Sequence, residues 1–547
     1  MCPNAHPLIS GGEAAARLQK VVTGPRGPGR CLHRAVLRIH CDTQPDPPNS
    51  PPGRGADTMR DRTTAASTKY ELLAVEIQQQ IAAGVLRPGD RLPSVRQSCA
   101  SRGLSPSTIS QAYHLLESRG LVRAAPRSGY FVAARADGVL LAEPQTSEPQ
   151  SGSQSVEVND LIYAILGSAR ARDIVPFGSA FLSPGLFPLD RLRRALVSST
   201  RRLKSWDMVE DLPPGNLRLK REIAKRYLLQ GLAVATDDIV LTHGAMEALN
   251  LCLNAVARPG DSVVVESPTF YVALQALQRM GLRAIEVPTH CREGIDLGRL
   301  AQVIELYRPK ACWLMTTFQN PLGSLMPEMK KRDLVELLAR HDLPLIEDDV
   351  YAELYEGNAA PLPAKVYDRR GLVLHCSSFS KCLAPGYRVG WAAPGRLARE
   401  VERLKLMTSL SGSIPAQAAV AEYLQEGGYD RHLRSLRQSL QAQRDSLFDA
   451  VTRHFPDGTR VARPIGGYFL WVELPVGVDA MALHRAALAQ RISLAPGPMF
   501  SPRAEFQHHI RLTCGQHWDE ALERATRTLA QLVVNAQSAD TPAQRSI

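Results

Sequence analysis

The chain has 547 residues, too many for one ordinary domain, since roughly one domain per ~150 residues is usual. Its composition, 44% hydrophobic and 22% charged, is that of a globular protein, and no run approaches the ~18 consecutive apolar residues of a membrane span. The net charge of +11 is concentrated in the amino-terminal part of the chain. Residues 1–69 hold 10 Lys/Arg against 5 Asp/Glu, and residues 70–132 hold 7 Lys/Arg against 4 Asp/Glu. This basic front indicates a polyanion partner, although a solvated basic surface explains the charge equally well.

The 10 cysteines are scattered, without a Cys-x-x-Cys pair or a Cys/His set at zinc-ligand spacing. The amino terminus also lacks the charged start and apolar stretch of a signal peptide. These features predict a reducing, cytoplasmic location and no metal site.

Residues 1–58 contain 9 Pro and 7 Gly, a composition that buries too little apolar surface to offset the entropy of ordering a backbone. We expect a disordered leader. Because Met59 opens a more ordinary sequence, our hypothesis is that translation starts there and that the leader is not made in the cell.

Residues 66–134 are expected to form a winged helix-turn-helix. Helical periodicity runs from Tyr70 to Gly84, a second helix covers about 93–101, and a third begins at Ser105-Pro106. Ser105 is a good N-cap, and a proline at the first helical position loses no hydrogen bond. Two short strands, 121–124 and 130–132, follow as the wing.

In this motif the start of the third helix enters the major groove, while arginines nearby neutralise phosphates. The alternative is a small helical packing domain with solvated arginines. The candidate DNA-binding residues are Arg91, Ser94, Arg96, Ser105, Ser107, Thr108, Ser110, Gln111, Tyr113 and Arg127.

The stretch from Pro88 to Val132 resembles the GntR family of bacterial transcription regulators. It carries LPS-x-R, a S-x-x-T-I helix start, A-Y-x-x-L and a G-Y-F-V wing. Pro106 and Ser110 depart from that family, which usually has a basic residue at the position of Pro106. The resemblance implies binding to double-stranded promoter DNA, and the departures imply an altered sequence preference or weaker binding.

Residues 135–158 are Glu/Pro/Gln/Ser-rich and predict a flexible linker. Over residues 159–535, apolar runs at 238–242, 262–266, 311–316, 343–347 and 372–377 alternate with helical stretches. This order predicts a mostly parallel sheet covered on both faces. Strands at 466–474 and 510–513, among helices, predict a smaller α+β subdomain, and residues 536–547 a disordered tail.

Groups that suit pyridoxal 5'-phosphate (PLP) follow the expected parallel strands, at the edge where such sheets bind ligands. PLP needs a lysine for its Schiff base, an acid for its pyridine nitrogen and an anion site. Each group alone also fits a solvated loop lysine, a helix cap, a turn or a core ring. The groups are Gly244, Ala245 and Met246 after 238–242, Phe270 after 262–266, Asn320 after 311–316, Asp348 and Tyr351 after 343–347, and Ser378, Ser380, Lys381 and Arg388 after 372–377.

Together these motifs resemble the fold-type I, class I/II aminotransferases across roughly residues 160–535. The resemblance implies an α/β PLP-dependent transferase with a small α+β subdomain, and Lys381 as the catalytic lysine. It also implies that Asp348 pairs with the pyridine nitrogen, that Tyr351 and Asn320 contact the ring oxygen, and that Phe270 stacks on the ring. By the same resemblance the phosphate contacts Ser378, Ser380, Arg388 and residues 244–246, and Arg511 binds a substrate carboxylate, unless it is a strand-edge arginine facing water.

A GntR-like winged helix joined to an aminotransferase-like domain is similar to the MocR subfamily of regulators. The resemblance implies a PLP-dependent transcription regulator that senses an amino compound or PLP itself, as a head-to-tail homodimer. Two alternatives stay open: an active aminotransferase with a secondary DNA-binding module, and a protein that uses PLP only as a structural element.

Overall fold

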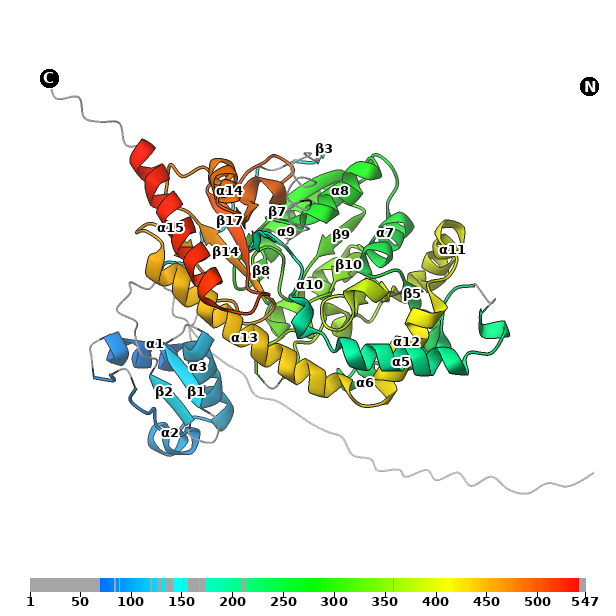
Figure 1. Cartoon of the computed structure of the whole chain (residues 1–547), viewed down its shortest axis with the longest axis horizontal. Coiled ribbons are helices and arrows are strands. Elements are labelled where there is room, and N and C mark those ends of the chain that lie inside the picture. Colours follow the sequence, from blue (N-terminus) through cyan, green and yellow to red (C-terminus); the bar gives the residue numbers. More distant parts are fainter. Residues whose placement is uncertain are drawn as a thin grey trace, which may run out of the picture. The chain divides into compact units, whose positions relative to one another are not determined.

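The computed structural model describes residues 69–82, 85–87, 89–118, 121–125, 129–132, 141–150, 152–155, 167, 173–208, 212–357 and 359–540 (Figure 1). The predicted leader lies outside these residues. The predicted tail does so only in part, because the last helix, α15 (Glu520–Asp540), makes residues 536–540 helical.

The amino-terminal module has the predicted order of three helices and a hairpin. Its helices are α1 (Lys69–Ala82), α2 (Val95–Arg102) and α3 (Pro106–Ser118), followed by the strands β1 (Val122–Ala125) and β2 (Gly129–Val132). The strands are antiparallel, with Val122 opposite Val132. The winged helix-turn-helix predicted from periodicity and capping is therefore confirmed in its elements.

Capping residues set the ends of the helices in this module. The Ser94 side chain accepts a hydrogen bond from the backbone N–H of Gln97, whose own side chain accepts one from the N–H of Ser94. Gly103 ends α2 with φ of 64°, a conformation that favours glycine. The Ser105 hydroxyl accepts a hydrogen bond of 3.2 Å from the N–H of Thr108 and caps α3 as expected.

The large domain is built on one sheet with a parallel centre. Its strands are, in spatial order, β3 (Gln154–Ser155), β7 (Arg283–His290), β6 (Ser262–Ser267), β9 (Ala311–Leu314), β10 (Leu345–Asp348), β11 (Val373–Ser378), β12 (Gly390–Ala393) and β5 (Val240–Thr242), and β8 (Gly294–Ile295) pairs with β7. Neighbours from β7 to β11 are parallel, whereas β12 is antiparallel to both β11 and β5. All five predicted strands are present, and the sequence did not predict β3, β7, β8 or β12.

Helices cover both faces of this sheet, which explains the unbroken apolar runs of its strands. Val263 and Val265 of β6 face the side that carries α7 (Ala245–Val256) and α8 (Tyr271–Arg279). Val264, between them, faces the side of α9 (Leu297–Tyr307) and α10 (Glu328–Arg340). Because successive residues of a strand point to opposite faces, all three valines are buried.

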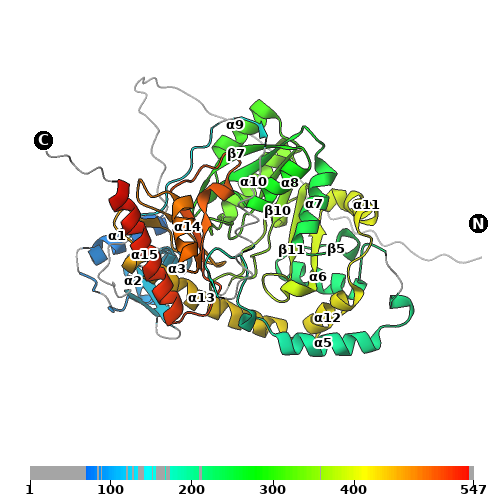
Figure 2. The ribbon, with the colours of Figure 1, turned by 45° about the horizontal axis from the view of Figure 1, so that its top comes forward.

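The smaller subdomain has an antiparallel sheet in the order β13 (Arg460–Val461), β14 (Phe469–Glu473), β17 (His509–Thr513) and β16 (Ala495–Pro496). Its helices are α14 (Ala480–Ala489) and α15, and α15 packs beside the long helix α13 (Tyr429–His454), as Figures 1 and 2 both show. Both predicted strands of this subdomain are confirmed.

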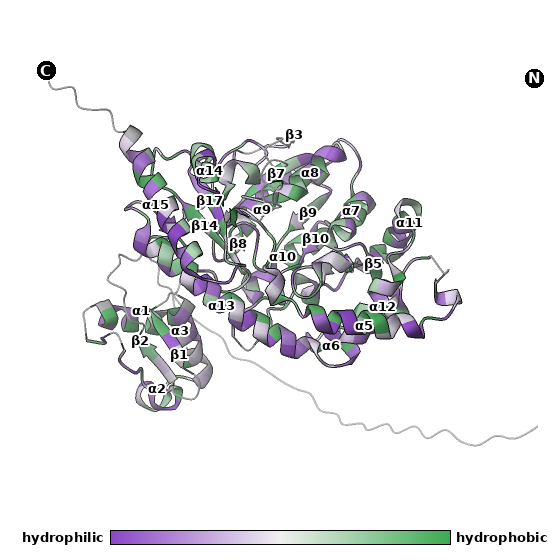
Figure 3. Cartoon of the chain, viewed as in Figure 1, coloured by the Kyte–Doolittle hydropathy of each residue, from purple (hydrophilic) through white to green (hydrophobic). Residues whose placement is uncertain are grey.

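Four further α-helices among the described residues have mixed surfaces, with hydrophilic and hydrophobic residues on the same helix (Figure 3). They are α5 (Leu189–Arg202), α6 (Leu217–Leu229), α11 (Ala398–Thr408) and α12 (Ile414–Gln425). A short parallel pair, β4 (Val175–Pro176) and β15 (Ile492–Ser493), ties the segment before α5 to the smaller subdomain. Among the residues that the structure describes, no helix is both long and apolar enough to cross a bilayer.

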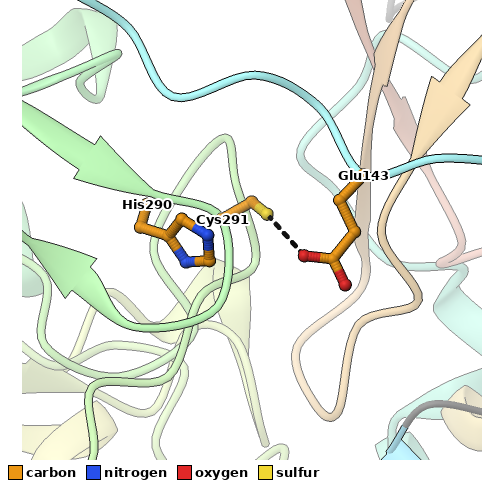
Figure 4. Close-up of side chains that lie close together, drawn as sticks. All are labelled: Glu143, His290 and Cys291. Atoms are coloured by element: carbon orange, nitrogen blue, oxygen red, sulfur yellow. Dashed lines mark hydrogen bonds between the residues drawn. The ribbon is translucent and has the colours of Figure 1, made fainter. Parts of the chain in front are cut away.

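Residues 141–150 and 152–155, predicted as part of a flexible linker, are bound along the large domain and the smaller subdomain. Glu143 forms an ion pair with Arg292 and accepts a hydrogen bond from the Cys291 thiol, with His290 beside them (Figure 4). The Ser147 hydroxyl donates to the Ser267 carbonyl over 2.7 Å, and β3 pairs with β7. The expectation of a flexible segment is therefore wrong for these residues.

Glu143, His290 and Cys291 also place three potential metal-ligand atoms within 4.8 Å of one another. The carboxylate is already neutralised by Arg292, and burial raises the pKa of the Cys291 thiol to about 12. Nδ1 of His290 accepts backbone N–H bonds of 3.3 and 3.4 Å from Arg292 and Glu293. These interactions account for the cluster as an anchor of the connecting segment.

Candidate cofactor site and DNA-binding helix

The side chains predicted to bind the cofactor follow strands that end at one edge of the large sheet. β6, β9, β10 and β11 are parallel to one another, and β5 runs in the same direction as β11 because each is antiparallel to β12. Ligands of such sheets bind outside the carboxyl ends of the strands. The topology therefore brings five loops together that lie far apart in the sequence.

Lys381 follows β11 and lines a pocket beside this edge. Its Nζ donates a hydrogen bond of 3.0 Å to the Ala180 carbonyl. Burial of the amine and the nearby Arg511 guanidinium lower the pKa of Lys381 to about 8, while the Asp348 carboxylate opposes the shift. Such an amine is unprotonated far more often at neutral pH than a solvated lysine, as a nucleophile requires.

Asp348, the last residue of β10, is buried with Oδ1 lacking a hydrogen-bond partner among the described residues. Burial, with the adjacent Asp349, raises the pKa of Asp348 to about 7. Asp349 differs in that its Oδ2 lies 2.9 Å from Nε2 of His375, although its Oδ1 also lacks a partner among the described residues. An acid with one oxygen to spare, next to Lys381, fits the partner that a protonated pyridine nitrogen requires.

Asn320 and Arg511 are buried in the site and are hydrogen-bonded to each other. Nη1 of Arg511 donates to Oδ1 of Asn320 over 2.9 Å, and Nη2 donates to the Gly178 carbonyl over 2.7 Å. Asn320 is buried, and no described residue accepts a hydrogen bond from its Nδ2. Arg511 is 1% exposed, so the alternative of a strand-edge arginine facing water is wrong.

The Tyr351 ring encloses the site on the side of the smaller subdomain. It is buried edge-on against the rings of Tyr468 and Phe469, with centroids at 5.5 and 5.4 Å. The Lys381 Nζ lies 5.9 Å from the centroid of the Tyr351 ring. Burial raises the pKa of Tyr351, so its hydroxyl stays protonated and able to donate.

The candidate phosphate corner is formed by the segment after β11 and the start of α7. Nη1 of Arg388 donates to the Ser380 hydroxyl over 3.3 Å, and Nη2 donates to the His243 carbonyl over 3.1 Å. A Cβ atom on Gly244 would lie 2.6 Å from Nη2 of Arg388, and the φ of 77° also favours glycine at this position. With the N-terminal N–H groups of α7 beginning at Ala245, the corner suits a phosphate.

The other predicted members of this corner are Met246, half-buried in the first turn of α7, and Ser378, whose hydroxyl accepts a hydrogen bond of 3.3 Å from the N–H of Ser380. Phe270 caps α8 and is half-buried, with its ring 5.1 Å from that of Tyr271. A half-buried ring after β6 can present a face to a bound ring.

The sequence did not indicate residues 178–182, which lie against both Lys381 and Arg511. Arg511 binds the carbonyl of Gly178, and both Lys381 and Tyr468 donate to that of Ala180. These contacts use backbone oxygens, which every residue type has. Of these residues only Gly178 has a residue type that the structure requires, because a Cβ there would lie 2.7 Å from the Leu494 backbone.

The DNA-binding candidates at the start of α3 differ in exposure. Ser105, Ser107 and Gln111 are exposed, and Thr108 and Ser110 are half-buried. The Ser105 hydroxyl already binds those of Ser107 and Thr108, at 2.9 and 2.8 Å. Gln111 therefore has the most freedom to meet a base edge.

Three further DNA-binding candidates lie just before α2 or in its first turn. Arg91 and Arg96 are exposed, and Ser94 is used as the cap of α2. Arg102, on the same module, is paired with Glu76 at 2.7 Å. Arg127 lies outside the described residues.

Tyr113 is buried, at 1% exposure, and its placement among the DNA-binding residues is wrong. Its hydroxyl lies 2.7 Å from that of Ser98 and donates to the Pro93 carbonyl over 2.8 Å. These bonds tie α3 to α2, so Tyr113 is a packing residue of the module.

Two family models match the chain, one on each part. Residues 69–132 match the bacterial regulatory proteins of the gntR family, and residues 208–529 match the aminotransferases of class I and II. The second match covers more than half of the chain.

Relatives and solved structures agree with these matches. The chain is 47% identical to the "Uncharacterized HTH-type transcriptional regulator YdcR" of Escherichia coli K12, over 85% of this chain and 99% of that protein. It is 35% identical to "YjiR" of the same organism, named in the same way, over 86% and 99%. It also resembles the crystal structure of LysN, the α-aminoadipate aminotransferase of Thermus thermophilus, with 28% identity and a TM-score of 0.63 over 69% of this chain and 98% of LysN.

Fold and site together define a winged helix-turn-helix joined to a fold-type I transferase domain of the PLP-dependent aminotransferase kind. The chain belongs to the MocR subfamily of GntR-type transcription regulators.

Proposed function

We propose that the large domain binds PLP at Lys381 and reads an amino compound, and that this state controls promoter binding by the winged helix, in the cytoplasm. The observation that carries the proposal is the pair of Lys381, with its pKa lowered to about 8, and Asp348, with its unpartnered buried oxygen. Support also comes from LysN, whose solved structure is complexed with N-(5'-phosphopyridoxyl)-L-leucine.

In this proposal different residues contact the ring nitrogen, the ring oxygen, the ring face and the phosphate of PLP. When bound, PLP supplies an electron sink for charge that develops at the α-carbon of an amino compound. Asp348 keeps the pyridine nitrogen protonated, and the unpartnered Nδ2 of Asn320 and the Tyr351 hydroxyl donate to the ring oxygen. Phe270 stacks on the ring, and the phosphate is held by Ser378, Ser380, Arg388 and the residues Gly244, Ala245 and Met246.

The test of the cofactor assignment is the visible absorbance of the purified full-length protein loaded with PLP. Lys381→Ala should lose the band of the lysine-bound cofactor, because among the described residues that line this pocket only Lys381 carries an amine. Lys310→Ala, at an exposed lysine between α9 and β9, is the matched control and should keep the band. An unchanged spectrum in Lys381→Ala would remove the assignment.

Promoter binding is tested by mobility shift with DNA from the promoter region of the protein's own gene. Sequence-specific binding that weakens steeply between about 50 and 200 mM salt is expected, because released counterions drive such binding. We further propose a head-to-tail homodimer. Sedimentation of the PLP-loaded protein should give twice the mass of one chain.

A second candidate function is amino-acid transamination. It is favoured by the lowered pKa of Lys381 and by Arg511, whose buried guanidinium offers a carboxylate a strong partner. Turnover of an amino acid with 2-oxoglutarate at about 1 s⁻¹ or faster would support a working enzyme.

A further inference from the structure

A cavity of about 290 Å³ lies beside Lys381, and its walls are mostly apolar. Phe181, Leu182, Phe187, Leu189 and Pro385 contribute to them. Among the described residues that line this cavity, Lys381 is the only charged one and Ser380 the only one with a hydroxyl group. The volume is at the lower end of the ~300–1,000 Å³ usual for small-molecule sites, which suits a ligand of amino-acid size.

One short segment connects this cavity to both of the cationic groups of the site. Arg511 binds the carbonyl of Gly178, Lys381 binds that of Ala180, and Phe181 follows directly. The Phe181 ring centroid lies 5.5 Å from Nζ of Lys381. A ligand with its carboxylate at Arg511 and its amine at Lys381 therefore has its side chain beside Phe181 and Leu182.

We propose that the compound read by this domain is an α-amino acid with an uncharged, apolar side chain. The inference rests on the proposed function, because it assumes that Lys381 and Arg511 face the same ligand. It goes beyond that function by assigning the side-chain class from the cavity walls.

The cavity walls should disfavour charged ligand side chains as well as favour apolar ones. The lining holds no arginine for a second carboxylate and no acid for a second amine among the described residues. A charged side chain that entered the cavity would lose its water without gaining a partner, whereas an apolar one gains contacts with the rings of Phe181 and Phe187. Dicarboxylic and dibasic amino acids should thus bind more weakly than phenylalanine, leucine or methionine.

The test is calorimetric titration of the full-length, PLP-loaded protein with six L-amino acids: phenylalanine, leucine, methionine, glutamate, aspartate and lysine. The first three should bind at least about tenfold more tightly than the last three, the size of effect that a hydrophobic pocket commonly gives. Tighter binding of glutamate, aspartate or lysine would overturn the inference. So would binding of none of the six.

Phe181 provides the variants, because it is 58% exposed and its replacement leaves the core intact. Phe181→Ala should weaken phenylalanine binding by about tenfold, and Phe181→Arg should shift the preference toward glutamate by supplying a cation. Leu229→Ala, at a leucine of α6 that is 79% exposed and does not line the cavity, is the control and should leave all six affinities unchanged. Equal effects of Phe181→Ala and Leu229→Ala would contradict the assignment of the cavity.

Failure of this inference and failure of the proposed function are distinguishable. If the wild-type protein shows no visible cofactor band, the proposed function fails. If the band is present and the amino-acid preference is reversed, only the side-chain class is wrong.

Discussion

Arg511 and Asn320 are hydrogen-bonded at 2.9 Å although 191 positions separate them in the chain. Asn320 follows β9 of the large domain, and Arg511 lies in the middle of β17 of the smaller subdomain. The bond therefore joins the two parts of the transferase domain at the proposed carboxylate site. A ligand bound by Arg511 contacts both parts at once.

Replacement of Arg511 by lysine should weaken the binding of amino-acid ligands by about 100-fold. A lysine keeps the charge but loses the two-pronged geometry that a carboxylate prefers, and its single nitrogen replaces the two that bind Asn320 and Gly178. The cofactor band should remain. Calorimetric titration of Arg511→Lys measures the loss, with Arg524→Lys, at an exposed arginine of α15, as the control. Unchanged ligand affinity in Arg511→Lys would exclude it from the carboxylate site.

Asp348→Asn should lower PLP affinity by about tenfold or more, since the neutral amide cannot pair with a protonated pyridine nitrogen. Removal of this carboxylate also removes the charge that raises the pKa of Lys381. Fluorescence titration of the cofactor-free protein with PLP measures the change. Asp333→Asn, at an exposed aspartate of α10, should behave as wild type. Equal PLP affinities in the two variants would rule out Asp348 as the ring-nitrogen partner.

The rate at which cofactor-free protein reacts with PLP should rise with pH through a midpoint near 8. The reacting form of Lys381 is the unprotonated amine, and its pKa is lowered to about 8 by burial and by Arg511. Below about pH 8 each unit of pH should cost about a factor of ten in rate, because the unprotonated fraction falls by that factor. Growth of the visible band at a series of pH values gives the profile. A midpoint near that of an ordinary lysine, about 10, would contradict the environment described for Nζ.

Two residues of α3, the helix predicted to enter the major groove, should respond to mutation in opposite ways. Gln111→Ala should reduce the preference for the specific promoter sequence by roughly 5- to 100-fold at unchanged stability, because Gln111 is exposed and a good side-chain contact to a base is worth ~1–3 kcal/mol. Tyr113→Phe should leave that preference unchanged and destabilise the module by about 1 kcal/mol through its lost hydrogen bonds to Ser98 and Pro93. Competition mobility shifts and thermal melting separate the two effects. The reverse pattern would show that the two residues had been assigned the wrong way round.

Most of the fold follows from local patterns in the sequence. Capping at Ser94 and Ser105 marks helix starts, and the apolar runs of β6 and β11 mark buried strands. The strand β12 was missed because its sequence, Gly390–Ala393, has little β-branched or alternating character. Tyr113 was misplaced because periodicity along α3 does not reveal the hydroxyl of Ser98 on another helix.

Candidate site residues can be named from the sequence where the chemistry needs particular side chains, as at Lys381 and Asp348, and the structure places both at or just after the ends of parallel strands. They cannot be named where the contact is a backbone oxygen, as at Gly178 and Ala180. The connecting segment shows a third limit. Its Glu/Pro/Gln/Ser composition predicts flexibility, yet specific partners such as Arg292 and Arg503 bind Glu143 and Gln150.

The central claim, that the state of the Lys381 site controls binding to promoter DNA, is tested most directly by one measurement. The Kd of the full-length, PLP-loaded protein for DNA from its own promoter is determined at fixed salt, with and without L-phenylalanine, for wild type and for Lys381→Ala. Coupling between two sites is typically worth roughly 5- to 150-fold, so the ligand should change the wild-type Kd by at least about fivefold and leave that of Lys381→Ala unchanged. A wild-type Kd that does not respond to the ligand, or an equal response in both proteins, would contradict the account.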